Sequence, residues 1–211
     1  MRNTLALQGA KRLVDSGNFK RIGILNFASA KNAGGGFLGG SQAQEESLAR
    51  SSALYASLQM CPEYYDYHRK QNKSLLYSDY MIYSPACPVF KHDSGKLLDT
   101  PYEVDFITSA APNRGAIARN QPAALEQLEA VFLQRIHAVL SLAANRDCDA
   151  LVLGAWGCGV FGNQPQSVAN WFGKHLLGDG EFANRFKYIS FSIPENPRIA
   201  ENTLSFQRVF E

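Results

Sequence analysis

Asn26-Phe-Ala-Ser-Ala-Lys-Asn-Ala-Gly-Gly-Gly-Phe-Leu-Gly-Gly-Ser-Gln-Ala-Gln-Glu-Glu46 is the stretch that decides how this chain folds. It continues a short apolar run, residues 21–27, which has the composition of a β-strand. Gly34, Gly35 and Gly36 allow the backbone to take positive φ angles and to approach another group closely. Their free N–H groups can form an anion-binding concavity. The order of strand, glycine loop and acidic helix therefore favours a site for a phosphorylated ligand.

An acidic helix is expected to begin directly after this loop. Ser41 and Gln44 have the spacing of a capping box, which predicts a helix over about residues 42–58. Glu45 and Glu46 then lie in its first turn, where adjacent side chains point in different directions. Acidic residues in a first turn often only balance the helix dipole. Their combination with a glycine triplet favours two carboxylates that contact different parts of one ligand.

The composition is that of an ordinary globular protein. The chain has 211 residues, of which 45% are hydrophobic and 19% charged, and its formal net charge is +2. This length is enough for one well-cored domain. Because the net charge is small and no basic run occurs, we expect no sequence-specific nucleic-acid partner.

The cysteines and histidines show neither a disulfide framework nor the spacing of a metal site. No Cys-x-x-Cys pair occurs, so we predict no metal, no cofactor and a reducing compartment. The N-terminus has no apolar signal region, and no apolar run has the length of a membrane span. The sequence therefore predicts a cytoplasmic protein with no membrane partner.

The remaining chain alternates between helical and strand-like patterns. Residues Asn3 and Thr4 can cap a first helix that ends at Ser16. Further strands are expected at residues 81–84, 102–108, 149–155 and 187–193, a hairpin-like excursion near 88–95, and helices at 122–144 and 165–177. The tyrosine-rich segment 63–73 can stack on bases, but a half-buried helix is the favoured interpretation.

This alternation predicts a three-layer α/β/α fold with a mixed, mainly parallel central sheet. We expect residues 1–193 to form a single catalytic domain and residues 194–211 to form a C-terminal tail without an assigned structure.

A second glycine-rich loop follows the strand at 149–155. Gly157, Gly159 and Gly162 precede a helix N-terminus, which makes a natural cradle for a diphosphate. The loop lacks the Gly-Lys-Ser/Thr of a Walker motif, and its Gly-x-Gly-x-x-Gly spacing is a weak signal so late in the chain. A tight turn beneath Trp156 and Phe161 is the structural alternative. In open α/β sheets, ligands bind beyond the carboxyl ends of the strands, where both glycine loops are expected.

The spacing from Gly-Gly-Gly to Gln-Glu-Glu resembles the signature of the poly(ADP-ribose) glycohydrolases. The flanking segments 25–32 and 46–55 look like the bacterial-type branch, and residues 81–85, 108–113 and 154–163 are similar to further family segments. This resemblance implies a macrodomain-like fold and hydrolysis of the ribose–ribose O-glycosidic bond of poly(ADP-ribose), which releases ADP-ribose. It also implies ADP-ribosylated proteins as partners.

Carried over to this chain, the resemblance implies that Glu46 is the catalytic acid and base and that Glu45 holds ribose hydroxyls. Glu46 would protonate the leaving 2′-oxygen and then activate water. The implied contacts to ADP-ribose come from both loops and the last strand: Ser29, Asn32, Gly34, Gly35, Gly36, Gln44, Gly157, Cys158, Gly159, Val160, Phe161, Gly162, Asn163 and, for adenine stacking, Phe191.

Two alternatives to this enzyme stay open from the sequence. One is a macrodomain that binds ADP-ribose without cutting it, although such a reader does not need paired acids. The other is a hydrolase that removes single ADP-ribose groups, because chain-length preference depends on pocket walls that the sequence does not define.

Overall fold

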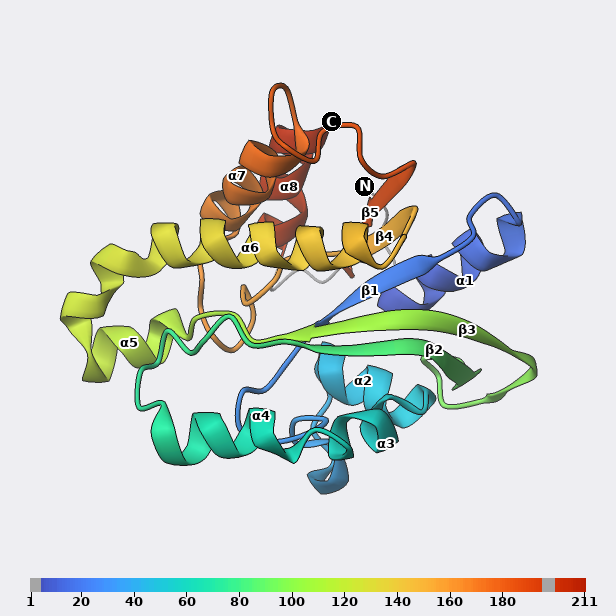
Figure 1. The fold of residues 1–211 in the computed structure, drawn as a ribbon, viewed down its shortest axis with the longest axis horizontal. Coiled ribbons are helices and arrows are strands. Elements are labelled where there is room, and N and C mark those ends of the chain that lie inside the picture. Colours follow the sequence, from blue (N-terminus) through green and yellow to red (C-terminus); the bar gives the residue numbers. More distant parts are fainter. Residues whose placement is uncertain (1–4, 195–199) are drawn as a thin grey trace.

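The computed structural model describes residues 5–194 and 200–211, and its core is a five-stranded sheet with helices on both faces (Figure 1). The strands lie in the order β2-β3-β1-β4-β5. Their bounds are β1 Ile22–Phe27, β2 Ile82–Lys91, β3 Leu97–Ser109, β4 Ala150–Leu153 and β5 Tyr188–Phe191. Strands β3, β1, β4 and β5 are parallel, and β2 is antiparallel to β3. The expected mixed, mainly parallel sheet and three-layer fold are therefore confirmed.

The helices divide between the two faces of this sheet (Figure 1). One layer contains α1 (Ala6–Ser16), α2 (Gln44–Ser51), α3 (Leu54–Gln59) and α4 (Pro62–Asp66). The other contains α5 (Arg114–Asn120), α6 (Leu128–Asn145), α7 (Pro165–Leu176) and α8 (Ala200–Phe210). Shorter turns are η1 (Phe37–Gly39), η2 (Tyr67–Gln71) and η3 (Pro122–Gln127).

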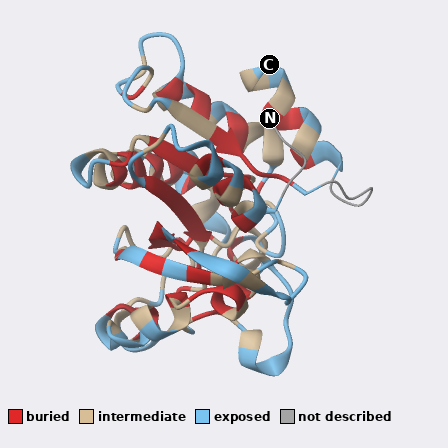
Figure 2. Cartoon of the chain, turned by 90° about the vertical axis from the view of Figure 1, so that its right-hand side faces the viewer, coloured by how far each residue is buried: buried red, intermediate tan, exposed pale blue. Residues whose placement is uncertain are grey.

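Side chains alternate between two cores along the central strands. Ile24 and Phe106 belong to the core beneath α1–α4, whereas their neighbours Leu25 and Ile107 belong to the core beneath α6–α8. Successive residues of a strand point to opposite faces of the sheet, so a strand covered on both faces must be apolar throughout. Figure 2 shows this pattern as buried residues concentrated along the sheet and on the inward faces of the helices.

The carboxyl ends of four parallel strands meet at one edge of the sheet. Strand β1 ends at Phe27, β3 at Ser109, β4 at Leu153 and β5 at Phe191. Both glycine loops leave the sheet here, one after β1 and one after β4, and these two strands are direct neighbours. The fold thereby brings together two loops that lie more than a hundred residues apart in the sequence.

Several expected boundaries differ from the structure. The helix expected over residues 42–58 is two helices, because Ser52 is extended (φ −143°, ψ 173°) and forms a β-bridge with Val89. Ser41 does not cap α2, since the N-cap is Ala43. Helix α1 begins at Ala6 after Leu5, and the proposed caps Asn3 and Thr4 lie outside the described residues.

Other expected elements are confirmed. The hairpin joins β2 to β3, and the expected helix at 122–144 comprises η3 and α6. Tyr64 and Tyr65 are buried, so the tyrosine-rich segment packs as a half-buried helix against its neighbours. The residues beyond 194 contain α8, which packs on α7.

Candidate active site

The glycine triplet curls around the side chain of Glu46. Gly34 and Gly35 have φ angles of 68° and 61°, in the left-handed region that favours glycine. A Cβ atom at Gly35 would lie 2.3 Å from Glu46 Oε1, so a side chain there would require the Glu46 carboxylate to move. The Gly36 N–H donates to the same oxygen at 2.9 Å. The triplet is therefore the close-packed wall of a carboxylate site.

Glu46 is held from two sides at the start of α2. Its Oε2 accepts a hydrogen bond from the Ala43 N–H at 3.1 Å, which caps the helix, while Oε1 faces the glycine loop. The side chain is mostly buried, with 9% of the residue exposed. These contacts fix one rotamer and point the carboxylate at the loop.

Glu45 lies deeper, between β1 and the start of the loop. Its Oε2 accepts from the Ser29 N–H at 2.7 Å, and its Oε1 accepts from Asn26 Nδ2 at 3.3 Å. Burial raises the pKa of Glu45 to about 8; the negative charge of Glu46 adds to this rise, and the hydrogen bonds from Ser29 and Asn26 oppose it. Glu45 therefore carries its proton over most of the neutral range and can donate a hydrogen bond.

Gln44 anchors the helix to the sheet. Its Nε2 donates to the Leu25 carbonyl at 2.7 Å, and its Oε1 accepts from the Phe27 N–H at 2.9 Å. Both polar ends of the side chain are thus engaged with β1. The structure places Gln44 as a support for Glu45 and Glu46, not as a side chain open to a ligand.

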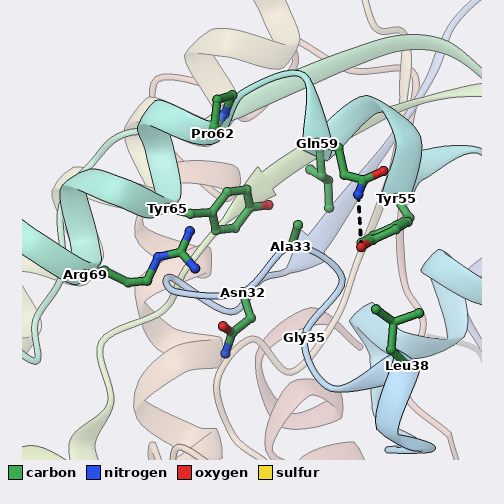
Figure 3. Close-up of a pocket in the computed structure, with 10 residues that line it drawn as sticks. Asn32, Ala33, Gly35, Leu38, Tyr55, Gln59, Pro62, Tyr65 and Arg69 are labelled. Carbon is green, nitrogen blue, oxygen red and sulfur yellow. Dashed lines mark hydrogen bonds between the residues drawn. The ribbon is translucent and has the colours of Figure 1, made fainter.

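The other predicted residues of the first loop lie close to these carboxylates. The Ser29 hydroxyl accepts from the Asn32 N–H at 3.1 Å and so stabilises the turn. The Asn32 residue is exposed, and its amide points away from the ring of Tyr65 (Figure 3). Asn32 is therefore free to meet a ligand at the edge of the loop.

The second loop is closed from within by Asn163. Its Nδ2 donates to the carbonyls of Pro112 at 2.9 Å and Gly157 at 3.0 Å. Gly157 and Gly162 have φ angles of 73° and 66°. A Cβ at Gly157 would lie 2.6 Å from Asn163 Nδ2, so the turn requires glycine. Asn163 is buried and shapes the loop from inside.

The tip of this loop faces outward. Val160 is 94% exposed, and Gly159 has no atom within 4 Å of an added Cβ. Phe161 is half-buried, and its ring centroid lies 6.2 Å from that of Tyr77. Cys158 donates to the Trp156 carbonyl, with a sulfur–oxygen distance of 3.7 Å. The loop thus presents open backbone on a fixed base.

Phe191 is not brought to this surface. It is 4% exposed, and its ring packs against Phe206 and Phe210 at centroid distances of 5.0 and 4.4 Å. Both aromatic partners come from α8, whose structure the sequence pattern did not define. Phe191 belongs to the core, and stacking on adenine does not fit its surroundings.

Three residues that support the site, Asn26, Tyr77 and Arg135, were missed by the sequence analysis. Asn26 is fully buried and joins Glu45 to Thr108, its Nδ2 lying 3.1 Å from Thr108 Oγ1. The signal that could have identified Asn26 in the sequence is a polar amide within an otherwise apolar strand. Tyr77 has a φ of 62°, contacts Phe161 and hydrogen-bonds Asn113 through its side chain. No sequence signal marks Tyr77, because its position depends on a loop held in place from elsewhere.

Arg135 of α6 holds that loop. Its Nη1 donates to the carbonyls of Leu76 at 2.8 Å and Ala110 at 2.9 Å, and its Nε contacts Asp79 at 2.8 Å. The Arg135 side chain is only 2% exposed, and its hydrogen bonds connect the loop before β2 to the end of β3. Within residues 5–194 and 200–211, no group of His, Cys, Asp or Glu could hold a metal ion, and no helix there is long and apolar enough to cross a membrane.

Two glycine loops lie at the carboxyl edge of a mainly parallel sheet, and one of them leads into a helix that begins with paired carboxylates, as in a macrodomain-like α/β protein. The profile of a family described as microbial-type PARG, catalytic domain, matches residues 1–92; PARG denotes poly(ADP-ribose) glycohydrolase. The structure resembles PARG from Thermomonospora curvata bound to the inhibitor ADP-HPD, with a TM-score of 0.94 and 46% identity over 99% of this chain and 77% of that one.

A second similar structure is PARG from Deinococcus radiodurans in complex with ADP-ribose, with a TM-score of 0.91 and 41% identity over 98% of this chain and 81% of that one. No significant match was found among curated protein sequences. The chain belongs to the microbial-type poly(ADP-ribose) glycohydrolases, a family of hydrolases. The family, the enzyme class and the macrodomain-like fold expected from the sequence are confirmed.

Proposed function

We propose that this chain hydrolyses the ribose–ribose O-glycosidic bonds of poly(ADP-ribose), with Glu46 as general acid and base. The observation that carries this assignment is the placement of the Glu46 carboxylate against the glycine triplet, with Oε1 2.9 Å from the Gly36 nitrogen. A general acid must sit within hydrogen-bond reach of the leaving oxygen, and this loop is where a terminal ribose can approach.

The reaction requires one proton donor and one water. Glu46 gives its proton to the leaving 2′-oxygen as the bond from that oxygen to the anomeric carbon breaks. The anomeric carbon then has oxocarbenium character. Water adds to it while Glu46 takes back a proton, which restores the starting state of the enzyme and yields ADP-ribose.

The remaining residues bind and orient the substrate. Glu45, with its raised pKa, can donate to a ribose hydroxyl while accepting from the Ser29 N–H and the Asn26 side-chain amide. The open backbone of Gly157–Gly162, before the N-terminus of α7, suits the diphosphate. The Phe161 ring is placed to pack on the face of the distal ribose. Asn32 and the glycine triplet 34–36 are placed to contact the edge of the same sugar. Gln44 and Asn163 act by holding the two loops in shape.

ADP-ribosylated proteins are the proposed carriers of the polymer, and the cytoplasm is the proposed location. Support for the location comes from the four cysteines, which are all unbridged (Cys61, Cys87, Cys148 and Cys158). Free thiols are typical of a reducing compartment.

The test is release of ADP-ribose from purified poly(ADP-ribose) by the wild type and by Glu46→Gln, with ADP-ribose affinity measured by calorimetry on both. We expect the variant to lose about 10²-fold or more in rate while it still binds ADP-ribose, because Gln keeps the size of the side chain and one acceptor oxygen for the backbone donors. Glu103→Gln, at an exposed position on β3, is the matched control and should behave as wild type.

Binding of ADP-ribose without release by the wild type would replace this proposal with a reader function. Release of single ADP-ribose groups from modified proteins, with none from the polymer, would replace it with mono-ADP-ribosyl hydrolysis.

A further inference from the structure

Phe161 has a fixed backbone but little lateral support from the second glycine loop that carries it. The Gly115 N–H at the start of α5 donates to the Phe161 carbonyl at 2.9 Å. The two residues before Phe161 leave its surroundings open: Val160 is 94% exposed, and a Cβ added at Gly159 would meet no atom within 4 Å. The loop itself therefore does little to orient the Phe161 ring.

Tyr77 contacts this ring from a distant part of the chain, the loop between η2 and β2. The two ring centroids lie 6.2 Å apart, and the ring planes are inclined at 46°. Such a separation is typical of interacting aromatic side chains. In the part of the chain that the structure describes, Tyr77 is the one aromatic neighbour of the Phe161 ring. The loop before β2 thus supports the second glycine loop from the side.

The backbone of Tyr77 has a conformation that tyrosine rarely adopts. Its φ of 62° is in the left-handed region, which is a genuine outlier for a bulky side chain. Strain of this kind persists only where the surrounding contacts enforce it, and it clusters at functional sites. Glycine at position 77 would relieve the strain, but it would also remove the ring that contacts Phe161.

Contacts on both sides of Tyr77 enforce its position. Arg135 Nη1 donates to the Leu76 carbonyl at 2.8 Å, and Arg135 Nε contacts the Asp79 carboxylate at 2.8 Å. Asn113, which caps α5 through its side chain, also hydrogen-bonds the Tyr77 side chain. The loop before β2 runs beside α5 (Figure 1). The start of α5 is therefore a common base for Tyr77 and for the backbone of the second glycine loop.

We propose that Tyr77 is a positioning residue that holds the Phe161 ring against the distal ribose of bound ADP-ribose. This assignment rests on the proposed function, in which Phe161 packs on that sugar. Tyr77 acts through Phe161, so its removal should matter only while the Phe161 ring is present. A small displacement of a group that positions the substrate is enough to reduce both binding and rate.

The test is a double-mutant cycle on ADP-ribose affinity, measured by calorimetry on the wild type, Tyr77→Ala, Phe161→Ala and the double variant. We expect Tyr77→Ala to weaken binding between about threefold and tenfold, the contribution of one aromatic pair. In the Phe161→Ala background, the same substitution should change affinity by less than about twofold, because the ring that it positions is gone. Tyr77→Phe keeps the ring and should bind as the wild type does.

Tyr80→Ala is the matched control, because Tyr80 is 55% exposed in the same loop and its ring packs on Tyr67 instead, at a centroid distance of 4.7 Å. It should bind ADP-ribose as the wild type does. Equal losses in Tyr80→Ala and Tyr77→Ala would overturn the assignment, as would a Tyr77→Phe loss as large as that of Tyr77→Ala.

A merely structural role of Tyr77 would weaken binding by the same factor with and without the Phe161 ring, and that result would also overturn the assignment. Unchanged affinity in Tyr77→Ala or in Phe161→Ala would do the same. Failure of the wild type to release ADP-ribose from the polymer would instead remove the proposed glycohydrolase function, while the affinity cycle still decides the role of Tyr77.

Discussion

At position 35, a single added methyl group would collide with the carboxylate of Glu46. We predict that Gly35→Ala displaces this carboxylate and reduces ADP-ribose release by about 10²-fold, as expected when a general acid is misplaced. The positive φ of 61° adds a backbone cost of about 1–2 kcal/mol to the free energy of folding. The measurement is the rate of release beside a urea unfolding curve, which shows that the variant is folded under the assay conditions.

Gly39→Ala is the control within the same loop. An added Cβ at Gly39 meets no atom within 4 Å, and its φ is not in the left-handed region. Its activity should match that of the wild type. If Gly39→Ala and Gly35→Ala lose activity equally, the loop acts through its flexibility and not through the contact with Glu46.

Sequence reasoning could place Glu45 and Glu46 beside the glycine triplet, because paired carboxylates and a glycine triplet are local patterns. It misjudged residues whose role depends on distant contacts. Gln44 is occupied by the backbone of β1, and Phe191 is covered by α8. Asn26 supports Glu45 only because β1 lies beside β3 and brings Thr108 within reach.

At the scale of elements, the break between α2 and α3 shows a tertiary contact overriding a helical pattern. The Ser52 hydroxyl donates to the Leu48 carbonyl and accepts from the Leu54 N–H, while Ala53 N–H donates to Pro88 in β2. These bonds replace one turn of helix by a short bridge to the sheet. The local sequence continues the helical periodicity, so the break could not be predicted without knowing where β2 lies.

Helix α8 closes the core behind β5. Phe206 is fully buried among Phe172 and Phe191, and Val209 packs on Gly173, where an added Cβ would lie 2.9 Å from Val209 Cγ1. We predict that Phe206→Ala lowers the free energy of unfolding by about 3–5 kcal/mol through the cavity that it leaves. Urea denaturation measures this loss.

Leu204→Ala serves as the matched control on the same helix, because Leu204 is 46% exposed and should cost less than about 1 kcal/mol. Similar small losses for both variants would mean that α8 is not docked in solution and that residues 200–211 are an appendage of the domain.

At the scale of the whole molecule, the alternation of strands and helices was sufficient to predict the layers but not the order of the strands. The chain pairs β1 with both β3 and β4, so the first strand becomes the centre of the sheet. Strands β1 and β4 are both short, mainly apolar and buried, so their composition does not tell which of them is the middle strand of the sheet. The placement matters for function, since it sets the two glycine loops side by side at the carboxyl edge.

The buried carboxyl of Glu45 makes the stability of the whole molecule depend on pH. Its folded pKa of about 8 lies above the ordinary value of 4.5, so between these values the folded state holds a proton that the unfolded state has lost. The contribution of Glu45 to the free energy of unfolding is fully present below its ordinary pKa of 4.5. It falls as the pH rises above that value, by at most about 1.4 kcal/mol per pH unit. Above pH 8 the group contributes no further loss, because both states are then ionised.

We predict that Glu45→Gln removes this dependence, because an amide keeps the shape of the carboxyl but does not ionise. Urea unfolding at pH 5 and pH 8 should show wild-type stability falling relative to the variant, by a difference on the order of a few kcal/mol. Glu103→Gln, at an exposed position, should follow the wild type at both pH values. Parallel behaviour of wild type and Glu45→Gln would mean that Glu45 is ionised throughout this range, and its proposed role as a hydrogen-bond donor to ribose would then be wrong.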